Sequence, residues 1–525
     1  MSSNDPTLKD DASNNNNHDQ TPTYKTYLCD PTSLYYDDYF CYSDDRTNLC
    51  LSRLKDITTL PVKIFNGLEN IITLDLGEIG LTKLESGIFD GLSKLTQLFL
   101  NHNRLVTLPS GIFKELHSLK ELYLNDNEFT SLESDIFSSL TNLTTLNISA
   151  NKLLALPNTI FKDSRLLQEL DLSKNGLTSL ESDIFSGLSC LLRLYISENK
   201  LSSLPKTIFN GIKSLEWLYL RSNKLKTLET DIFSGLSCLS KLDISANKLL
   251  SLPKAIFNGM ESLEWLYLES NKLKSLETDI FSGLPKLMYV NLFDNKLILP
   301  NPIFNRTKNL QSLILSSNKI ESLTADFLNG MTHVTSLHLA NNRLSFLPKT
   351  IFHRLVNLDR LALNLNKLKS LDAEIFTGLS RLKYLFINNN ELSTLPDTIF
   401  HDTKSLELLS LDSNKLKILT PDIFNGLPCL RILHINNNEL VSLPKTIFKE
   451  LKFLTSLSLH SNKLFSLEAD TFIGLSELKS LSISNNELST LPKDIFRYNS
   501  TAAIKTTTTT TTTNRAPGPE RIEIA

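Results

Sequence analysis

The side chains of this chain best suited to recognition chemistry are aromatic and charged residues that recur at fixed intervals between residues 193 and 293. Aromatic rings with Arg nearby dominate the energetics of protein interfaces, because they bury large areas at a small cost in side-chain entropy. The residues predicted to contact a partner are Tyr195, Trp217, Tyr219, Arg221, Asp243, Trp265, Tyr267, Glu269, Tyr289 and Phe293. Arg193 and Lys241 occur among them, and Trp217 and Trp265 are the only tryptophans in the chain.

Patterns that would support catalysis or cofactor binding do not occur in the sequence. It contains no G-x-x-x-x-G-K-[ST], H-E-x-x-H, G-x-S-x-G or C-x-x-C. His338, His434 and His460 are expected to point outward from strands, and the last two belong to adjacent repeats, but no third metal ligand accompanies them. We therefore predict a protein that is not an enzyme and that holds neither a cofactor nor a metal ion.

Composition and charge argue against two classes of partner. The formal net charge is −3 and the pI is about 6.3, so the chain has no overall basic field for nucleic acid. No run of about 18 uncharged apolar residues is present, so we predict no membrane span. Residues 1–20 lack the basic and apolar regions of a signal peptide, which favours either a cytosolic protein or a sequence that lacks its start.

The elements that position the aromatic residues follow from a short sequence repeat. The phrase L-x-L-x-x-N places Asn at 17 positions from Asn103 to Asn486, and Ile79 takes the Asn position in one earlier unit. Successive Asn lie 24 positions apart, except that the step that contains Leu299 is one position shorter.

A unit of this length cannot bury its own Leu and Phe residues, so about 18 units must stack on one another. The L-x-L segment alternates with period two, which predicts a short strand that pairs in parallel with the next one. The Asn amides are expected to form a ladder that bonds loop backbone groups.

A second period, twice as long, overlies the first. The sequence LEWLYLRSNKLKTLETDIFSGL at 215–236 occurs again, with two changes, at 263–284. Units with Pro after the last Leu alternate with units that carry Glu, Asp or Thr there. The duplicated block is therefore a pair of units, and copying of this pair explains why the chain has two tryptophans.

The repeats resemble the typical 24-residue class of the leucine-rich repeat family, over roughly residues 50–497. The phrases LEWLYLRSNKLKTLETDIFSGL and LLRLYISENKLSSLPKTIFNGI match the pattern of this class, L-x-x-L-x-L-x-x-N-x-L-x-x-L-P-x-x-x-F-x-x-L-x-x-L. The resemblance implies an α/β horseshoe-type right-handed solenoid. Its parallel β-sheet would line the concave face, and short turns or 3-10 segments would form the convex face. It also implies binding of other macromolecules by the concave sheet.

The chain divides into four segments on this basis. We predict a disordered low-complexity start at 1–25, a cap-like segment at 26–56, the solenoid at 57–498 and a Thr-rich disordered tail at 499–525. Extracellular relatives carry a cysteine-stapled cap, so Cys29, Cys41 and Cys50 are disulfide candidates, with one thiol left over. The alternative is an unbridged apolar cap. Cys190, Cys238 and Cys429 are expected to be free thiols, because the first two lie two turns apart.

Two localisations and three kinds of function are compatible with the sequence. Relatives of the receptor type favour an extracellular or cell-surface protein, and the lack of a signal peptide leaves a cytoplasmic one as the alternative. N-glycosylation candidates are Asn142, Asn147, Asn305 and Asn499. The predicted function is protein–protein recognition of the adhesion or immune and signalling receptor type. The alternatives are an intracellular scaffold that regulates a bound enzyme, and a glycan-binding module.

Two surfaces of the concave sheet could carry that function. The first is the aromatic set given above, whose rings could instead stack on one another and only shield the sheet. The second is a polar strip between residues 342 and 486, which could meet a glycan or a hydrated protein surface or could be plain solvated sheet. Its predicted members are Asn388, Asn389, Asp412, His434, Asn436, Ser458, His460 and Ser482.

Overall fold

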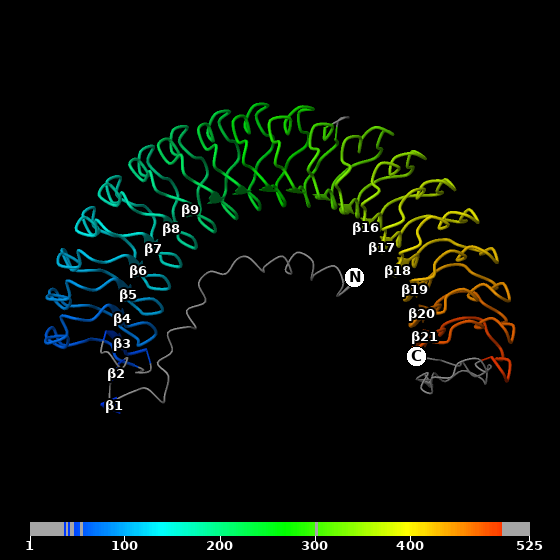
Figure 1. Ribbon diagram of the computed structural model, residues 1–525, viewed down its shortest axis with the longest axis horizontal. Helices are drawn as coiled ribbons and strands as arrows, with labels where there is room; N and C mark the ends of the chain where they lie inside the picture. The colour runs from blue at the N-terminus through cyan, green and yellow to red at the C-terminus, as the bar shows by residue number, and fades with distance from the viewer. Residues whose placement is uncertain (1–35, 38–39, 43–46, 53–55, 300–302, 496–525) are drawn as a thin grey trace, which may run out of the picture.

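The computed structural model describes residues 36–37, 40–42, 47–52, 56–299 and 303–495. Over these residues the chain forms an arc in which each turn contributes one short strand to the inner edge and loops to the outer edge (Figure 1). The strands follow one another along the arc in chain order, up to β21 at the far end. The predicted horseshoe with a parallel sheet on its concave face is thereby confirmed.

All strands are short. The first three are β1 Tyr36–Asp37, β2 Phe40–Tyr42 and β3 Asn48–Cys50. The strands of the repeat units are β4 Thr73–Asp75, β5 Gln97–Phe99, β6 Glu121–Tyr123, β7 Thr145–Asn147, β8 Glu169–Asp171, β9 Arg193–Tyr195, β10 Trp217–Tyr219, β11 Lys241–Asp243, β12 Trp265–Tyr267, β13 Tyr289–Asn291, β14 Ser312–Ile314, β15 Ser336–His338, β16 Arg360–Ala362, β17 Tyr384–Phe386, β18 Leu408–Ser410, β19 Ile432–His434, β20 Ser456–Ser458 and β21 Ser480–Ser482. These are 18 strands for the 18 predicted units.

The pairing register is the same along the whole solenoid. From β3 to β21 each strand pairs in parallel with the next, and equivalent residues lie opposite one another, as Leu194, Leu218 and Leu242 do. The shorter step keeps this register, because Tyr289 lies opposite Ser312, so the missing residue is absorbed outside the strands. Among the described strands, antiparallel pairing is confined to β1 with β2 and β2 with β3. A fixed register makes the equivalent positions of successive units neighbours on the sheet.

The core consists of columns of identical side chains that run along the arc. The middle residue of every strand from β3 to β21 is buried, and the repeated Phe residues that the structure describes are buried behind the sheet, away from the concave face, with Leu328 at this position in the unit of Asn318. Neighbouring Phe rings stack, for example Phe209 on Phe233 with centroids 6.1 Å apart and Phe161 on Phe185 with centroids 6.5 Å apart. Full burial of one such side chain contributes about 1.5–3 kcal/mol, and it requires the adjacent turn. Stacking therefore stabilises each unit through its neighbours.

The predicted Asn ladder is present. Asn223 donates from Nδ2 to the carbonyls of Ile196 (2.9 Å) and Leu220 (3.1 Å), and its Oδ1 accepts from the N–H of Leu201 (3.1 Å). The Leu220 carbonyl also accepts from Asn247 of the next turn (3.0 Å). Just before each Asn, from His102 to Asn485, the chain has a φ of +51° to +58° although none of these residues is Gly. The left-handed residue turns the backbone so that the amide reaches two turns at once.

The outer edge of the arc consists of turns. Among the described residues no helix and no 3-10 segment is assigned, so turns are the form that the convex side takes. The doubled period has a physical counterpart here, since a Lys after Pro in one unit pairs with an acidic residue of the next. The pairs are Lys206 with Asp231, Lys254 with Asp279, Lys349 with Glu374 and Lys445 with Asp470. Each involves an exposed Lys, so solvent screens the pair and its contribution to stability is small.

Candidate functional site

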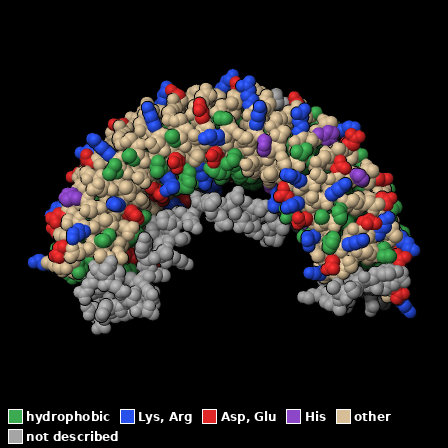
Figure 2. Space-filling view, viewed as in Figure 1, with side chains coloured by type: hydrophobic (Ala, Val, Ile, Leu, Met, Phe, Trp, Pro, Cys, Tyr) green, Lys and Arg blue, Asp and Glu red, His purple; other side chains and the backbone are tan. Residues whose placement is uncertain are grey.

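The predicted aromatic residues come together on strands β9 to β13, at the middle of the concave sheet. Three rows of side chains cross these strands, because the residues six, four and two positions before each Asn face the same way. We call their aromatic and charged members the central patch. It contains Arg193, Tyr195, Trp217, Tyr219, Arg221, Lys241, Asp243, Trp265, Tyr267, Glu269, Tyr289 and Phe293. Figure 2 shows hydrophobic side chains on the inner rim near the middle of the arc, with basic and acidic ones among them.

Cations lie over the rings of the central patch. The guanidinium of Arg193 lies 4.6 Å from the Trp217 ring centroid and also pairs with Glu169 of β8 at 3.2 Å. Lys241 Nζ lies 5.7 Å from the Trp217 ring, 5.2 Å from the Tyr219 ring and 5.7 Å from the Tyr267 ring. Contacts of this kind contribute about 0.5–2 kcal/mol. Lys241 therefore ties three rings from the strands on either side of it into one surface.

The tyrosines stack in two pairs on either side of Asp243. Tyr195 and Tyr219 are parallel with centroids 5.0 Å apart, and Tyr267 and Tyr289 are tilted by 41° with centroids 5.0 Å apart. Burial, and then the neighbouring Tyr267, raise the pKa of Tyr289. The stacking that we gave as the alternative to binding thus occurs within the patch, but it leaves the second face or the edge of each ring to other contacts.

The third row carries an ion pair that spans two turns. Arg221 donates to Glu269 (3.2 Å) and to Ser245 (3.1 Å), which lies between them. Half of the Arg221 side chain is exposed, but only 13% of the Glu269 side chain is. Burial, and then the nearby Asp243 carboxylate, raise the pKa of Glu269 to about 7. The centre of the patch therefore holds a carboxyl group that changes charge near neutral pH.

Exposure separates the predicted residues into two groups. Phe293 and Arg221 are exposed, and Tyr195, Trp217, Tyr219, Trp265, Tyr267, Glu269 and Tyr289 are half-buried. Asp243 is buried instead, with its Oδ1 accepting from the N–H of Ser245 at 2.9 Å, and burial raises its pKa. Its position in the row suggested an outward side chain. The neighbouring strands cover it because they carry the larger rings of Tyr219 and Tyr267.

Two further aromatic contacts were not among the predicted site residues. Phe99 and Tyr123 stack on β5 and β6 with centroids 4.9 Å apart, and the Arg360 guanidinium lies 4.8 Å from the Tyr384 ring on β16 and β17. Each contact joins equivalent positions of two successive units, so the repeat period was the signal that could have revealed both. Each of these two contacts joins two neighbouring strands, whereas the central patch continues over five strands.

The polar strip has the composition that the sequence suggested. On β18 to β20 and the segments that follow them, Ser410 donates to Asp412 (2.5 Å), and His460 contacts Ser461 (3.1 Å). Burial lowers the pKa of His460, the nearby Asp412 opposes this shift and His434 adds to it, so these three side chains lie close together. Over the described part of the chain, no group of three or more His, Cys, Asp or Glu residues is arranged to hold a metal ion. The members of the strip thus offer hydrogen bonds, and half-buried Leu408 and Ile432 lie beside them on β18 and β19. Farther back along the sheet, burial lowers the pKa of His338 to about 4.

The cap cysteines are described only in part. Cys41 lies opposite Cys50 in the antiparallel pair of β2 and β3, and Cys50 is a free thiol whose Sγ lies 2.9 Å from the Ser52 hydroxyl and 3.4 Å from Asp75. Burial raises the pKa of Cys50. Cys29 and the side chain of Cys41 lie outside the described residues, so the predicted disulfide stays a prediction. Cys190, Cys238 and Cys429 are free thiols.

The glycosylation candidates lie on different surfaces. Asn142 and Asn305 are exposed, whereas Asn147 is half-buried on the concave sheet, where its Oδ1 accepts from the N–H and the hydroxyl of Ser149. Asn499 lies outside the described residues. A glycan on Asn147 would stand two strands before the central patch.

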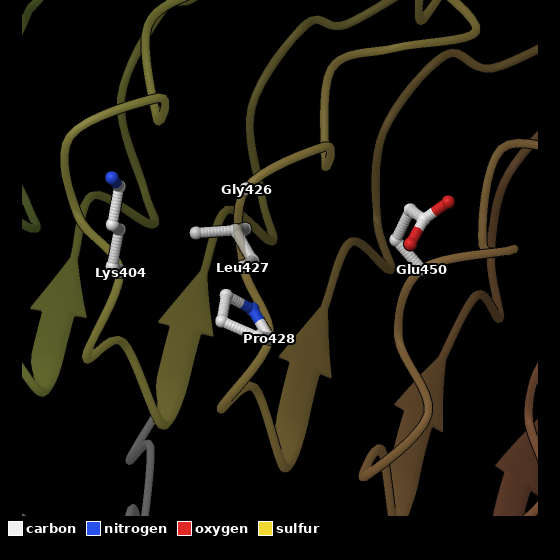
Figure 3. Close-up of a pocket in the computed structure, with 5 residues that line it drawn as sticks. All are labelled: Lys404, Gly426, Leu427, Pro428 and Glu450. Atoms are coloured by element: carbon white, nitrogen blue, oxygen red, sulfur yellow. The ribbon is translucent and has the colours of Figure 1, made fainter.

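A shallow hollow lies among the segments that precede strands β18, β19 and β20. It is lined by Lys404, Gly426, Leu427, Pro428 and Glu450, from three successive turns. Figure 3 shows Lys404 and Glu450 on opposite sides of the other three residues. Among the five there is no nucleophile with an adjacent base, so this hollow does not resemble an active site.

Within the described residues, none of the segments is a helix long and apolar enough to cross a membrane.

Comparison with known proteins agrees with this architecture. Models of the leucine-rich repeat match eleven segments, at 47–105, 93–153, 141–201, 191–249, 239–297, 308–368, 332–392, 356–416, 381–440, 430–488 and 452–500. No curated protein sequence matches the chain.

Three solved structures illustrate the similarity. A leucine-rich repeat protein of Leptospira interrogans is 34% identical with a TM-score of 0.63, over 70% of this chain and 91% of that one. Drosophila Toll, in its complex with Spatzle, is 21% identical with a TM-score of 0.68, over 79% of this chain and 57% of the other. The ectodomain of an Arabidopsis thaliana membrane receptor kinase, GASSHO1/SCHENGEN3, in complex with CASPARIAN STRIP INTEGRITY FACTOR 2, is 25% identical with a TM-score of 0.61, over 88% of this chain and 57% of the other.

Proposed function

The chain belongs to the leucine-rich repeat family, and from that premise we propose that it recognises a protein ligand with the central patch of its concave sheet. The observation that carries this proposal is the continuity of the patch, in which Lys241 connects the rings of Trp217, Tyr219 and Tyr267. A surface of this kind is rigid before a ligand arrives, so little side-chain entropy is lost on binding. Large rings with an exposed Arg at the edge are also the composition of interface hot spots.

We further propose a role of the adhesion or immune and signalling receptor type, without catalysis. Support comes from the fold that the chain shares with Toll, solved in complex with Spatzle, and with the plant membrane receptor kinase ectodomain, solved in complex with CASPARIAN STRIP INTEGRITY FACTOR 2. The runner-up is an intracellular scaffold that regulates a bound enzyme. Thiol counting on the denatured, unreduced protein separates the two roles: six free thiols support the scaffold, and four support one cap disulfide of an extracellular protein.

The two tryptophans provide a direct test of the concave site. Because Trp217 and Trp265 are the only tryptophans and both lie in the central patch, their fluorescence reports on this surface without a label. A ligand isolated by crosslinking to the purified protein, and then produced on its own, is expected to change this emission on titration. A ligand that binds with unchanged emission would place the contact elsewhere.

Substitution tests the energetic role of the same residues. We expect Trp217→Ala combined with Trp265→Ala to weaken capture of that ligand by more than about 2 kcal/mol, or roughly thirtyfold in Kd. Thermal unfolding should change little, because both rings lie outside the core. The matched control is Tyr384→Ala with Ile432→Ala, at the same strand position and also two turns apart. Equal capture by the tryptophan variant, or equal loss in the control, would contradict the proposed site.

A further inference from the structure

One row of side chains outside the concave sheet carries a single sign of charge over eight successive turns. These residues directly follow the repeated Asn of their units, where the chain has left the strand. We call them the basic ladder, which consists of Lys200, Lys224, Lys248, Lys272, Lys296, Lys319, Arg343 and Lys367. Seven are exposed and Lys319 is half-buried.

The backbone fixes the ladder residues directly above one another. The N–H of Lys224 donates to the carbonyl of Leu201 in the preceding turn (2.8 Å), and the N–H of Lys248 donates to that of Leu225 (2.8 Å). The same bond recurs at Lys272 (2.9 Å) and at each later ladder residue. Turns are separated by about 4.8 Å at the strands and by 6.1 Å at the Phe209–Phe233 stack. The eight cations therefore form one row, and seven steps at the spacing of the strands make it roughly 35 Å long.

The rest of the solenoid shows what this position does when the signs alternate. Lys152 pairs with Glu128 at 3.1 Å, Lys415 with Glu391 at 3.2 Å, and Lys463 with Glu439 at 3.2 Å, each across one turn. Side chains at this position thus reach their counterparts in the neighbouring turn.

In the ladder this pairing is replaced by repulsion. Among the described residues, Arg343 alone of the eight forms an ion pair, with Glu321 at 3.3 Å. Like charges at such spacing destabilise one another slightly. Further exposed cations lie two residues beyond ladder positions, at Lys226, Lys274 and Lys369. The acidic residues next to the ladder are Glu198, Asp294 and Glu321, and Glu391 holds the ladder position in the turn after Lys367. A long row of cations with few acidic neighbours is suited to an external anion that is itself long and regularly charged.

We propose that the basic ladder binds an extended anionic polysaccharide that carries one carboxylate or sulfate per sugar. A pyranose in an extended chain advances by a distance close to that between turns, so one charge per sugar meets one cation per turn. Seven of the eight residues are Lys, whose ammonium acts as a mobile point charge and does not require the planar two-bond geometry that Arg offers to phosphate. Leu250 and Ile298, which are 51% and 64% exposed beside the ladder, can contact the apolar faces of sugar rings.

The same positions argue against a nucleic acid. Proteins that bind single strands interleave cations with aromatic rings on which bases stack. Two residues beyond the ladder residues stand Ser202, Lys226, Leu250, Lys274, Ile298, Glu321, Ser345 and Lys369, none of which is aromatic. A protein partner is also less suited, because the ladder is one charge wide and offers no broad apolar area like that of the central patch.

Polygalacturonate, with one carboxylate per sugar, is the probe for the experiment. We expect the full chain to bind it at low salt and to lose affinity steeply as salt rises, because exposed charges are screened. Lys224→Gln, Lys248→Gln and Lys272→Gln together should weaken binding by about tenfold, since three adjacent contacts are removed. The matched control is Lys152→Gln, Lys415→Gln and Lys463→Gln, which changes the same position where Lys is already paired.

The outcomes decide between the ladder and its alternatives. Neutral dextran should not bind, and the triple ladder variant should keep the unfolding midpoint of the parent because its changes are exposed. Equal loss of affinity in both triple variants would show that only net charge matters and would overturn the proposal. Tighter binding of oligothymidylate or of polyglutamate with the same number of charges would overturn it in favour of a nucleic acid or an acidic protein segment.

Discussion

The central turns, with strands β9 to β13, and the C-terminal turns, with strands β17 to β21, share one scaffold and differ in what they display. In both, Phe rings stack at about the same distance, 6.1 Å for Phe209–Phe233 and 6.1 Å for Phe424–Phe448. The repeated Asn bonds equivalent backbone groups in both, as the Nδ2 of Asn223 and Asn438 do at 2.9 and 3.1 Å. The Phe and Asn positions that hold successive turns together are therefore the same in both regions, whatever side chains the concave surface carries.

The outward positions differ in size and in how they are paired. In the central turns, contacts cross the strands, as in the two-turn ion pair of Arg221 with Glu269. In the C-terminal turns, Ser410 bonds Asp412 of its own repeat, and ion pairs such as Lys463 with Glu439 join only adjacent turns. Just past the strands, the central turns carry only cations, while Lys415, Glu439 and Lys463 alternate in sign. The two regions therefore keep the same scaffold and differ in side chains that the scaffold does not need.

The largest effect is expected where the two regions are equivalent. Phe233→Ala and Phe448→Ala should each destabilise the turns around them by about 4 kcal/mol, because each removes a buried ring from a stack. Urea unfolding followed by circular dichroism gives the loss, and hydrogen exchange of the adjacent turns shows where it acts. The two losses should agree within about 1 kcal/mol. A much smaller loss for Phe448→Ala would mean that the C-terminal turns do not share the scaffold energetics.

A smaller effect, confined to the central turns, is expected from pH. The pKa of Glu269 is raised from 4.5 to about 7, so the folded chain holds a proton there that the unfolded chain releases. Stability from this group is therefore complete below about pH 4.5 and declines as pH rises to about 7, by up to about 3 kcal/mol. Glu269→Gln removes the group and should flatten this part of the profile, as measured by urea midpoints between pH 4.5 and 8. An unchanged slope in the variant would show that Glu269 is already ionised in the folded chain at low pH.

The sequence predicted the scaffold and the membership of the central patch, because a constant repeat length fixes which side chains become neighbours. Trp217, Lys241 and Trp265 lie on adjacent strands as the period requires. The repeat pattern of the sequence could not predict that Asp243 is buried, because its burial depends on the sizes of the aromatic rings in the flanking strands. Nor could it predict the pairing of Arg221 with Glu269 two turns away, because that contact depends on side-chain rotamers. Both features arise from packing between units, which a repeat pattern alone does not contain.

The smallest effects are expected from exchanging the charge patterns of the two regions. Lys248→Glu places an acidic residue between Lys224 and Lys272, which reproduces the arrangement of Glu439 between Lys415 and Lys463. We expect it to raise the free energy of unfolding by about 0.5 kcal/mol at low salt, because two repulsions become attractions between exposed groups. Glu439→Gln should lower it by a similar amount, since it breaks the 3.2 Å pair with Lys463. Both differences should disappear in 1 M salt, where the screening length is about 3 Å.

The sign of the change in unfolding free energy caused by Lys248→Glu decides whether the ladder cations cost stability. If Lys248→Glu stabilises the chain while it weakens binding of polygalacturonate, the unpaired cations cost stability and are explained by their ligand. If Lys248→Glu destabilises the chain even at low salt, the lysines of the ladder contribute to the fold through the packing of their aliphatic stems. In that case the contrast between paired and unpaired turns would be a property of the scaffold, and the basic ladder would lose its main support as a binding surface.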